Sequence, residues 1–173
     1  PLPEGSVSSE VADVAKEFFG NVAFRSPLVP NFTGAVQWLW SQVEGPYVFH
    51  LEDDWVLNHE VRIEKLIAEI LGHDACVQCS LRTGRNYAGY INKVCLSPSL
   101  LDGNFVRMFH SKFNLGINPE VQLRSVRLQG GKSKLYESDA KSVTDIGRSW
   151  IRSSEYKRPS KRQFVAWERK GEI

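Results

Sequence analysis

The chain has 173 residues, of which 42% are hydrophobic and 24% are charged, and it includes five Trp. This composition excludes a low-complexity or disordered chain, and the length suits one domain whose core needs no disulfide or structural metal. The net charge of +2 is too balanced to indicate a nucleic-acid-binding protein, and no stretch approaches the roughly 18 apolar residues of a membrane span.

Cysteine usage indicates a reducing compartment. Cys76, Cys79 and Cys95 are an odd number, and no signal-like apolar leader is present, so we expect a cytoplasmic protein without a disulfide framework. The chain begins at Pro1 and its only methionine is Met108, from which we expect the natural start to be missing.

Helices and strands alternate in the first half of the predicted structure. Apolar residues recur at helical spacing in three segments, and a mostly apolar run that would be buried in a parallel sheet lies between the second and the third. A short strand follows the first helix. The predicted helices are residues 8–18, 31–43 and 58–71, and the predicted strands are residues 21–25 and 47–51.

The second half gives weaker signals. Two strand candidates flank a loop rich in Gly, Arg and Asn at residues 82–92, and two helices follow them. Two extended segments precede a basic tail. The predicted strands are residues 75–81, 93–97, 134–137 and 142–146, and the predicted helices are residues 99–110 and 118–126. Strands that alternate with helices favour an α/β fold with a mostly parallel sheet.

Three adjacent carboxylates, Glu52, Asp53 and Asp54, follow the apolar strand directly. Neighbouring carboxylates repel one another, and a divalent cation neutralises them best. Hard oxygen ligands favour Mg²⁺ or Mn²⁺, which also bridge phosphate oxygens. The alternative is a solvated acidic cluster at the start of a helix, although Asn58 already offers a helix cap there.

These residues resemble a known family. The run YVFHLEDDWVL at residues 47–57 looks like the strand and acidic motif of GT-A glycosyltransferases, and Asn31 with Gly34 is similar to the Asn-x-Gly helix that precedes this strand in family 2. The resemblance implies a three-layer α/β sandwich with a mostly parallel central sheet. It also implies that Asp54 ligates the metal, while Glu52 and Asp53 lie on the donor.

The resemblance divides the chain into two parts. Residues 1–150 would form the catalytic domain, without its first strand-helix unit, and residues 151–173 would form a basic C-terminal tail. Arg148 begins the basic segment, which is interleaved with aromatic residues and could close over a pyrophosphate. A nucleic-acid contact and a solvated tail whose aromatic residues pack on the body are the alternatives.

Two later acidic residues complete the expected site. Glu120 opens a helix after Asn118 and resembles the general base that deprotonates the acceptor hydroxyl in inverting members of the superfamily. Asp145 stands where a metal-binding His is usual in a late segment of that family, which implies a second ligand. The alternatives are an acid that favours the helix dipole at Glu120 and a turn before Gly147 at Asp145.

The expected function is transfer of a sugar from a nucleoside-diphosphate sugar to the hydroxyl of a glycan or another acceptor, with Mn²⁺ or Mg²⁺ and with inversion. The rivals are a metal-dependent nucleotidyltransferase or phosphodiesterase and a non-catalytic domain that binds glycans or nucleic acid. We expect no zinc or redox site at Cys76 and Cys79, because residues three apart on a regular strand point to opposite faces.

Overall fold

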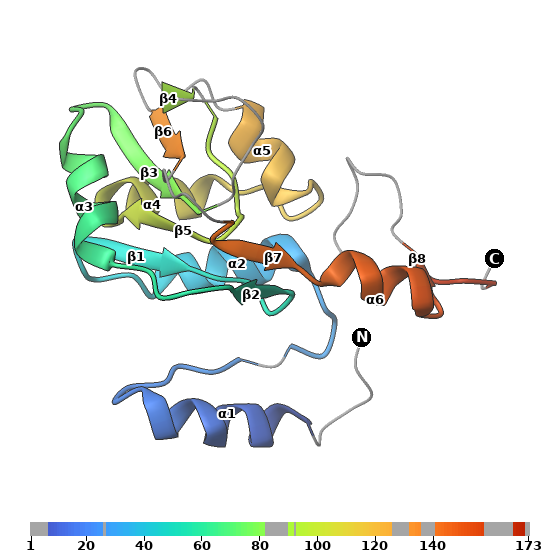
Figure 1. The fold of residues 1–173 in the computed structure, drawn as a ribbon. Helices are drawn as coiled ribbons and strands as arrows, with labels where there is room; N and C mark the ends of the chain where they lie inside the picture. Colours follow the sequence, from blue (N-terminus) through green and yellow to red (C-terminus); the bar gives the residue numbers. More distant parts are fainter. Residues whose placement is uncertain are drawn as a thin grey trace.

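The computed structural model describes residues 7–25, 27–81, 90–91, 93–125, 132–135, 141–157 and 168–171. Its body is a five-stranded sheet with helices on both faces, and a short two-stranded ribbon lies beside it (Figure 1). None of the described helices combines the length and the apolar character that crossing a bilayer requires.

The five-stranded sheet is mixed. Its strands lie in the order β1 (Tyr47–His50), β5 (Ser99–Asp102), β3 (Cys76–Ser80), β6 (Lys132–Leu135) and β4 (Tyr90–Ile91). Among these described strands only β3 and β6 pair in parallel, and the other three pairings are antiparallel. The prediction of a three-layer sandwich with a mostly parallel central sheet is therefore wrong.

The reason for this correction is β5, which lies between β1 and β3 and runs opposite to both. The sequence predicted residues 99–110 as one helix, because their Leu, Phe and Val residues fit helical spacing. The side chain of Asp102 accepts a hydrogen bond from the backbone of Phe105 at 2.7 Å, so the helix begins only after Asp102. The four residues that end at this cap, Ser99–Asp102, are consequently available to pair as a strand.

A second, two-stranded sheet extends from the end of β1. It pairs β2 (Trp55–Leu57) with β7 (Val143–Asp145) in antiparallel register, so that Trp55 faces Asp145. Asn58 fastens the ribbon, because its amide donates to Lys141 O at 2.7 Å and its carbonyl accepts from the Thr144 hydroxyl at 3.0 Å. A third pair joins β8 (Tyr156–Lys157) to β9 (Glu168–Arg169).

Most of the predicted helices form, with shifted ends. Asn31 caps the second helix as expected, since its side chain accepts from Gly34 N at 2.7 Å. The third helix begins at Ile63 rather than at residue 58, because Asn58 is engaged in the ribbon. The helices are α1 (Val7–Phe18), α2 (Phe32–Ser41), α3 (Ile63–Leu71), α4 (Gly103–Phe109), α5 (Pro119–Ser125) and α6 (Gly147–Ser153), with a 3-10 turn η1 (His110–Lys112).

The sheet separates two hydrophobic cores. Leu101 points to the face covered by α2, α4 and α5, where Trp40 packs against Phe105, Phe109 and Phe113. Its neighbour Leu100 points to the opposite face, which α3 and β7 cover. This alternation along β5 fixes which side of the sheet each helix occupies.

Two predicted strands do not form, and several predicted segments lie outside the described residues. Residues 21–25 and 93–97 have no regular structure. The loop at residues 82–89, the end of the predicted strand at residues 136–137, and residues 158–167 of the basic tail lie outside the described part of the chain.

Candidate functional site

Three separate segments bring five carboxylates together. The turn that follows β1 carries Glu52, Asp53 and Asp54, the ribbon partner β7 ends in Asp145, and Glu120 lies in the first turn of α5. Backbone hydrogen bonds hold the turn, from Trp55 N to Glu52 O at 3.3 Å and from Ile146 N to Asp54 O at 2.8 Å. We call these five residues the acid cluster.

Glu52 is the most strongly perturbed member of the acid cluster. Burial raises the pKa of its carboxyl to about 8, and the negative charges of Asp54, Glu120 and Asp53 add to this effect. A hydrogen bond from the Trp55 side chain opposes it only in part. At neutral pH Glu52 is therefore mainly protonated, so it can donate a hydrogen bond as well as accept one.

Asp54 is the last residue of the turn and directly precedes β2 of the ribbon. Burial raises the pKa of Asp54 above its usual range, followed by the charges of Asp145 and Asp53. Its Oδ1 atom is buried and accepts no hydrogen bond from any described residue. A buried acceptor oxygen without a donor is costly unless a cation or a water satisfies it.

Gly147 forms a wall of this site. A Cβ atom at Gly147 would lie 2.9 Å from Asp54 Cβ and 3.0 Å from Asp54 Cγ, and still closer to Oδ2. Real Cβ contacts are longer than this, so only glycine leaves the Asp54 carboxylate where it stands. This role of Gly147 could not be predicted from the sequence, because Gly147 and Asp54 meet only through the pairing of β2 with β7.

Glu120 is held at both its backbone and its side chain. Asn118 caps α5, because its Oδ1 accepts from Glu120 N at 2.8 Å. One turn further on, Arg124 donates from Nη2 to Glu120 Oε2 at 3.2 Å. Arg124 was not among the predicted site residues, although its spacing of four residues from Glu120 is the usual spacing of a helical ion pair.

The acid cluster is not a complete metal cage. Among the described residues no three His, Cys, Asp or Glu side chains are arranged as a metal-binding group. Mg²⁺ and related hard cations, however, usually bind through one or two carboxylates together with waters and substrate phosphates. Asp54 and Asp145 fit that pattern, since they are electrostatically coupled and Asp54 offers an unsatisfied oxygen.

For Arg148, the remaining predicted site residue, the structure describes the backbone. Arg148 belongs to α6, directly after Gly147, so its backbone adjoins the acid cluster. The side chain of Arg148 lies outside the described structure. Its role at a pyrophosphate stays a prediction.

His50 does not belong to the site chemistry. The side chain is 7% exposed, and burial lowers the pKa of the imidazole to about 4. His50 shares a face of β1 with Val48, which packs against the core under α2 and α4. It is a neutral core residue at physiological pH.

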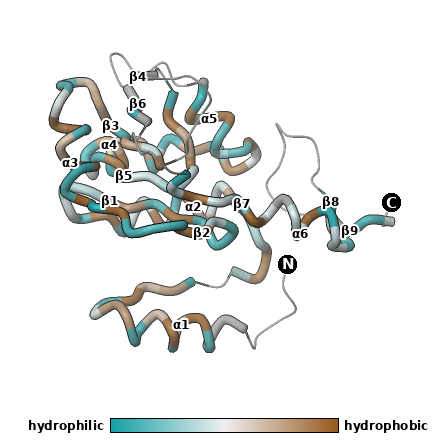
Figure 2. Tube along the Cα trace, viewed as in Figure 1, coloured by the Kyte–Doolittle hydropathy of each residue, from teal (hydrophilic) through white to brown (hydrophobic). Residues whose placement is uncertain are grey.

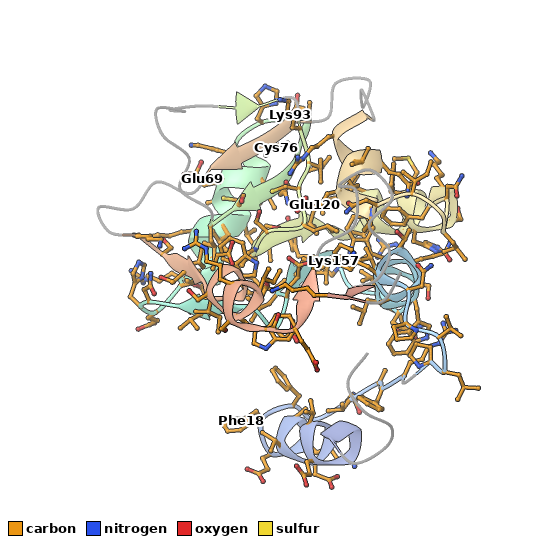
Figure 3. All side chains as sticks on the ribbon, turned by 90° about the vertical axis from the view of Figure 1, so that its right-hand side faces the viewer. Phe18, Glu69, Cys76, Lys93, Glu120 and Lys157 are labelled. Carbon is orange, nitrogen blue, oxygen red and sulfur yellow. The ribbon has the colours of Figure 1, made fainter. Side chains whose placement is uncertain are left out.

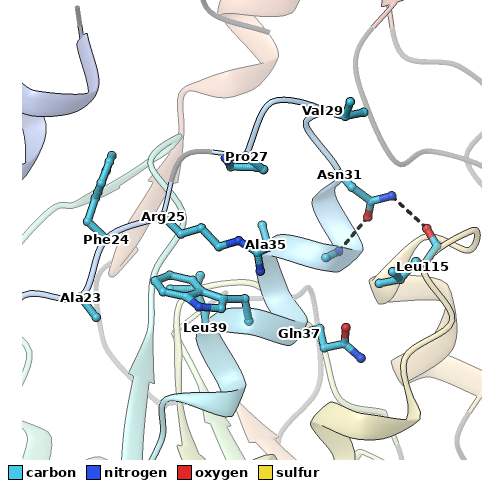
Figure 4. Close-up of a pocket in the computed structure, with 12 residues that line it drawn as sticks. Ala23, Phe24, Arg25, Pro27, Val29, Asn31, Ala35, Gln37, Leu39 and Leu115 are labelled. Carbon is cyan, nitrogen blue, oxygen red and sulfur yellow. Dashed lines mark hydrogen bonds between the residues drawn. The ribbon is translucent and has the colours of Figure 1, made fainter. Parts of the chain in front are cut away.

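A pocket of about 570 Å³ lies beside α2, between its outer face and the segment that precedes it (Figure 4). Phe24, Trp38 and Leu39 contribute apolar surface, and Arg25 contributes a positive charge. The side chain of Asn31 closes one end, where it donates to Leu115 O at 3.1 Å. The full lining is Ala23, Phe24, Arg25, Pro27, Val29, Asn31, Gly34, Ala35, Gln37, Trp38, Leu39 and Leu115.

One loop connects this pocket with the acid cluster. Leu115 lines the pocket, and Glu120 follows five residues later, so their Cα atoms lie at most about 18 Å apart. The loop is fixed to α2 by a hydrogen bond from the Thr33 hydroxyl to Ile117 O at 2.7 Å. Gln122 fixes it to α5, since its amide donates to Ile117 O at 2.7 Å.

Comparisons with known proteins give no further guide to this site. No protein-family model, no characterised protein and no solved structure matches the chain. The chemistry of the acid cluster and of the pocket beside α2 therefore carries the functional inference.

Proposed function

We propose that this chain transfers a sugar from a nucleoside-diphosphate sugar to an acceptor hydroxyl, with Mn²⁺ or Mg²⁺ at the acid cluster. The observation that carries this proposal is the convergence of Asp54, Asp145 and Glu120 from distant parts of the sequence. Carboxylates that lie close together repel one another, and this repulsion adds to the effect of burial in raising the pKa values of Glu52 and Asp54. A bound cation with its phosphate ligands would relieve that repulsion.

Asp54 and Asp145 are the residues that would hold the cation. When bound there, the ion would neutralise the charge that develops on the departing diphosphate. The carboxyl of Glu52, protonated at neutral pH, would donate a hydrogen bond to the donor, and Asp53 would accept one from its hydroxyl groups. Gly147 leaves room for the Asp54 carboxylate beside β7.

Glu120 would act as the general base. Arg124 engages Oε2, which leaves Oε1 to accept the proton of the acceptor hydroxyl. As the oxygen of the acceptor bonds to the anomeric carbon, the bond between that carbon and the diphosphate oxygen breaks. One direct displacement of this kind inverts the configuration at the anomeric carbon.

The pocket beside α2 suits the flat base of the nucleotide. Trp38 and Phe24 offer aromatic surface for stacking, and Arg25 offers a cation. A ligand that reaches from this pocket toward Glu120 would place its phosphates near the acid cluster. Quenching of tryptophan fluorescence by a nucleoside diphosphate, reduced in Trp38→Leu, would support this placement.

A thermal-shift titration tests the proposal. We expect Mn²⁺ with a nucleoside diphosphate to stabilise the protein by roughly 2.7 kcal/mol at a hundred times the dissociation constant. Neither component alone should have this effect. Asp54→Asn should abolish the joint effect, whereas Glu64→Gln, an exposed carboxylate on α3, should preserve it.

The result that overturns the proposal is equally specific. If none of the uridine, guanosine, adenosine, cytidine or thymidine diphosphates stabilises the protein with either metal, the acid cluster does not bind the donor. Stabilisation that survives in Asp54→Asn would move the site elsewhere.

A further inference from the structure

Helix α1 carries an apolar stripe that no described part of the molecule covers. Val11, Val14 and Phe18 are 57%, 55% and 75% exposed. Figure 1 shows α1 apart from the sheets and the other helices, and Figure 2 shows hydrophobic residues recurring along it. Figure 3 shows the side chain of Phe18 on this helix.

A helix of this size needs a packing surface. α1 has 12 residues, which is near the lower limit for a helix that is stable alone in water. It makes no substantial contact with any other described helix or strand. The apolar stripe is therefore expected to be covered when α1 performs its role.

The spacing of the stripe fits another helix as its partner. Val11, Val14 and Phe18 are separated by three and then four residues, so they share one face of α1 and match the a and d positions at which paired helices contact each other. Ala12 and Ala15 flank one side of this seam, and their small side chains permit a close approach of a second helix.

The charged residues beside the seam of α1 favour a partner helix that is basic. Glu10 and Glu17 are seven residues apart and flank the other side of the seam. Neither forms an ion pair with a described residue, whereas Asp13 pairs with Lys16 at 3.0 Å away from the seam. α1 as a whole has three acidic residues and one basic residue.

These charges argue against two other occupants. In an antiparallel pair of α1 helices, Glu10 and Glu17 would face the same Glu side chains of the second copy, and in a parallel pair Glu10 would face Ala15, so no basic residue meets them in either arrangement. An anionic membrane surface would repel an acidic helix, because interfacial helices are rich in Lys and Arg. A basic amphipathic helix meets both the apolar and the electrostatic requirement.

We propose that α1 is a docking helix for a basic amphipathic helix of a partner. The apolar seam of the partner would pack on Val11, Val14 and Phe18, and its Lys or Arg side chains would pair with Glu10 and Glu17. This interaction is independent of the chemistry proposed for the acid cluster.

Two synthetic heptad peptides test this proposal on the full chain. Both carry Leu at positions a and d; one carries Lys at positions e and g, and the other carries Glu there. We expect the Lys peptide to bind at least ten times more tightly than the Glu peptide in a fluorescence-anisotropy titration. Glu10→Lys combined with Glu17→Lys should reverse this preference.

Single substitutions distinguish the contribution of the apolar seam to binding from that of the other residues of α1. Val14→Asp should weaken binding of the Lys peptide at least tenfold without changing the melting temperature of the body, whereas Lys16→Gln should leave binding unchanged. Equal binding of both peptides, or binding unaffected by Val14→Asp, overturns the proposal. Self-association of the protein that Val14→Asp abolishes also overturns it, because a second copy is then the occupant.

Discussion

Partial burial, together with the charges of Asp54 and Glu120, raises the pKa of Glu52 to about 8, so its carboxyl is mainly protonated at neutral pH. Its pKa is about 8 in the folded protein and near the ordinary value of 4.5 in the unfolded chain. Between these values the unfolded chain releases the proton while the folded protein keeps it. The free energy of unfolding contributed by Glu52 therefore falls as the pH rises through this window.

Glu52→Gln should remove this pH dependence. We expect the variant to match the wild type near pH 4 and to exceed its free energy of unfolding by roughly 1–3 kcal/mol at pH 8. Urea denaturation at pH 4, 6 and 8 measures the difference in the free energy of unfolding between the variant and the wild type. Glu64→Gln is the control, and its difference from the wild type should be the same at the three pH values. A difference that does not change with pH would contradict the assignment.

The contact between Gly147 and Asp54 can be tested without knowledge of the sugar donor. Gly147→Ala places a methyl group against Asp54 and should lower the free energy of unfolding by roughly 1–3 kcal/mol. Gly20→Ala is the matched control, since no atom lies within 4 Å of a Cβ built there. Chemical denaturation gives both values, and equal losses would show that Asp54 moves aside freely.

An ion pair joins helix α3 to strand β6. Lys134 and Glu69 contact each other with side chains that are 17% and 29% exposed. Lys134→Met alone should lower the free energy of unfolding by roughly 1–3 kcal/mol, because it leaves a partly buried carboxylate unpaired. Replacing both residues with Met should cost less than the single change.

The exposed pair Asp13–Lys16 on α1 provides the control. Lys16→Met should change the free energy of unfolding by less than about 0.5 kcal/mol, because both partners are solvated. Urea denaturation of the four proteins measures these differences. If the double substitution costs as much as Lys134→Met, the pair does not join the two elements.

The elements that the sequence predicted correctly are those with local signals. α2 begins at the Asn31 cap and carries an apolar stripe, and β1 is a short apolar run before a turn. β5 was missed because its status as a strand depends on two neighbours that are distant in sequence. Local spacing alone favoured a helix there.

The expectation that Cys76 and Cys79 point to opposite faces was also wrong. The register of β3 shifts between Cys76 and Gln78, and both thiols lie in the core beneath α3. Burial raises the pKa of the Cys79 thiol to about 12, so it is an unreactive core residue. A bulge of this kind leaves no mark in an apolar run.

Stability should be uneven along the chain. β3 and β5 are central strands between two cores, whereas α1 stands apart from both. Native-state hydrogen exchange should therefore protect the amides of β3 and β5 to the level of global unfolding and leave those of α1 nearly unprotected. Comparable protection in α1 and β3 would contradict this.

The candidate site could be predicted from the sequence only in outline. Glu52, Asp53 and Asp54 stand out because they are adjacent and follow an apolar strand. Their proximity to Asp145 and Glu120 depends on the β2–β7 ribbon and on the packing of α5. The pocket beside α2 could not be predicted, because an irregular segment without periodicity forms one of its walls.

The position of β5 affects how the chain is made. His50 pairs with Ser99 roughly fifty residues later, so β1 has no neighbour in the sheet until β5 has been synthesised. Until then the nascent chain presents an unpaired strand edge and an open apolar face to solvent. A ribosomal product that stops before residue 99 should consequently depend on chaperones, whereas one extended past Asp102 can close both edges of β5.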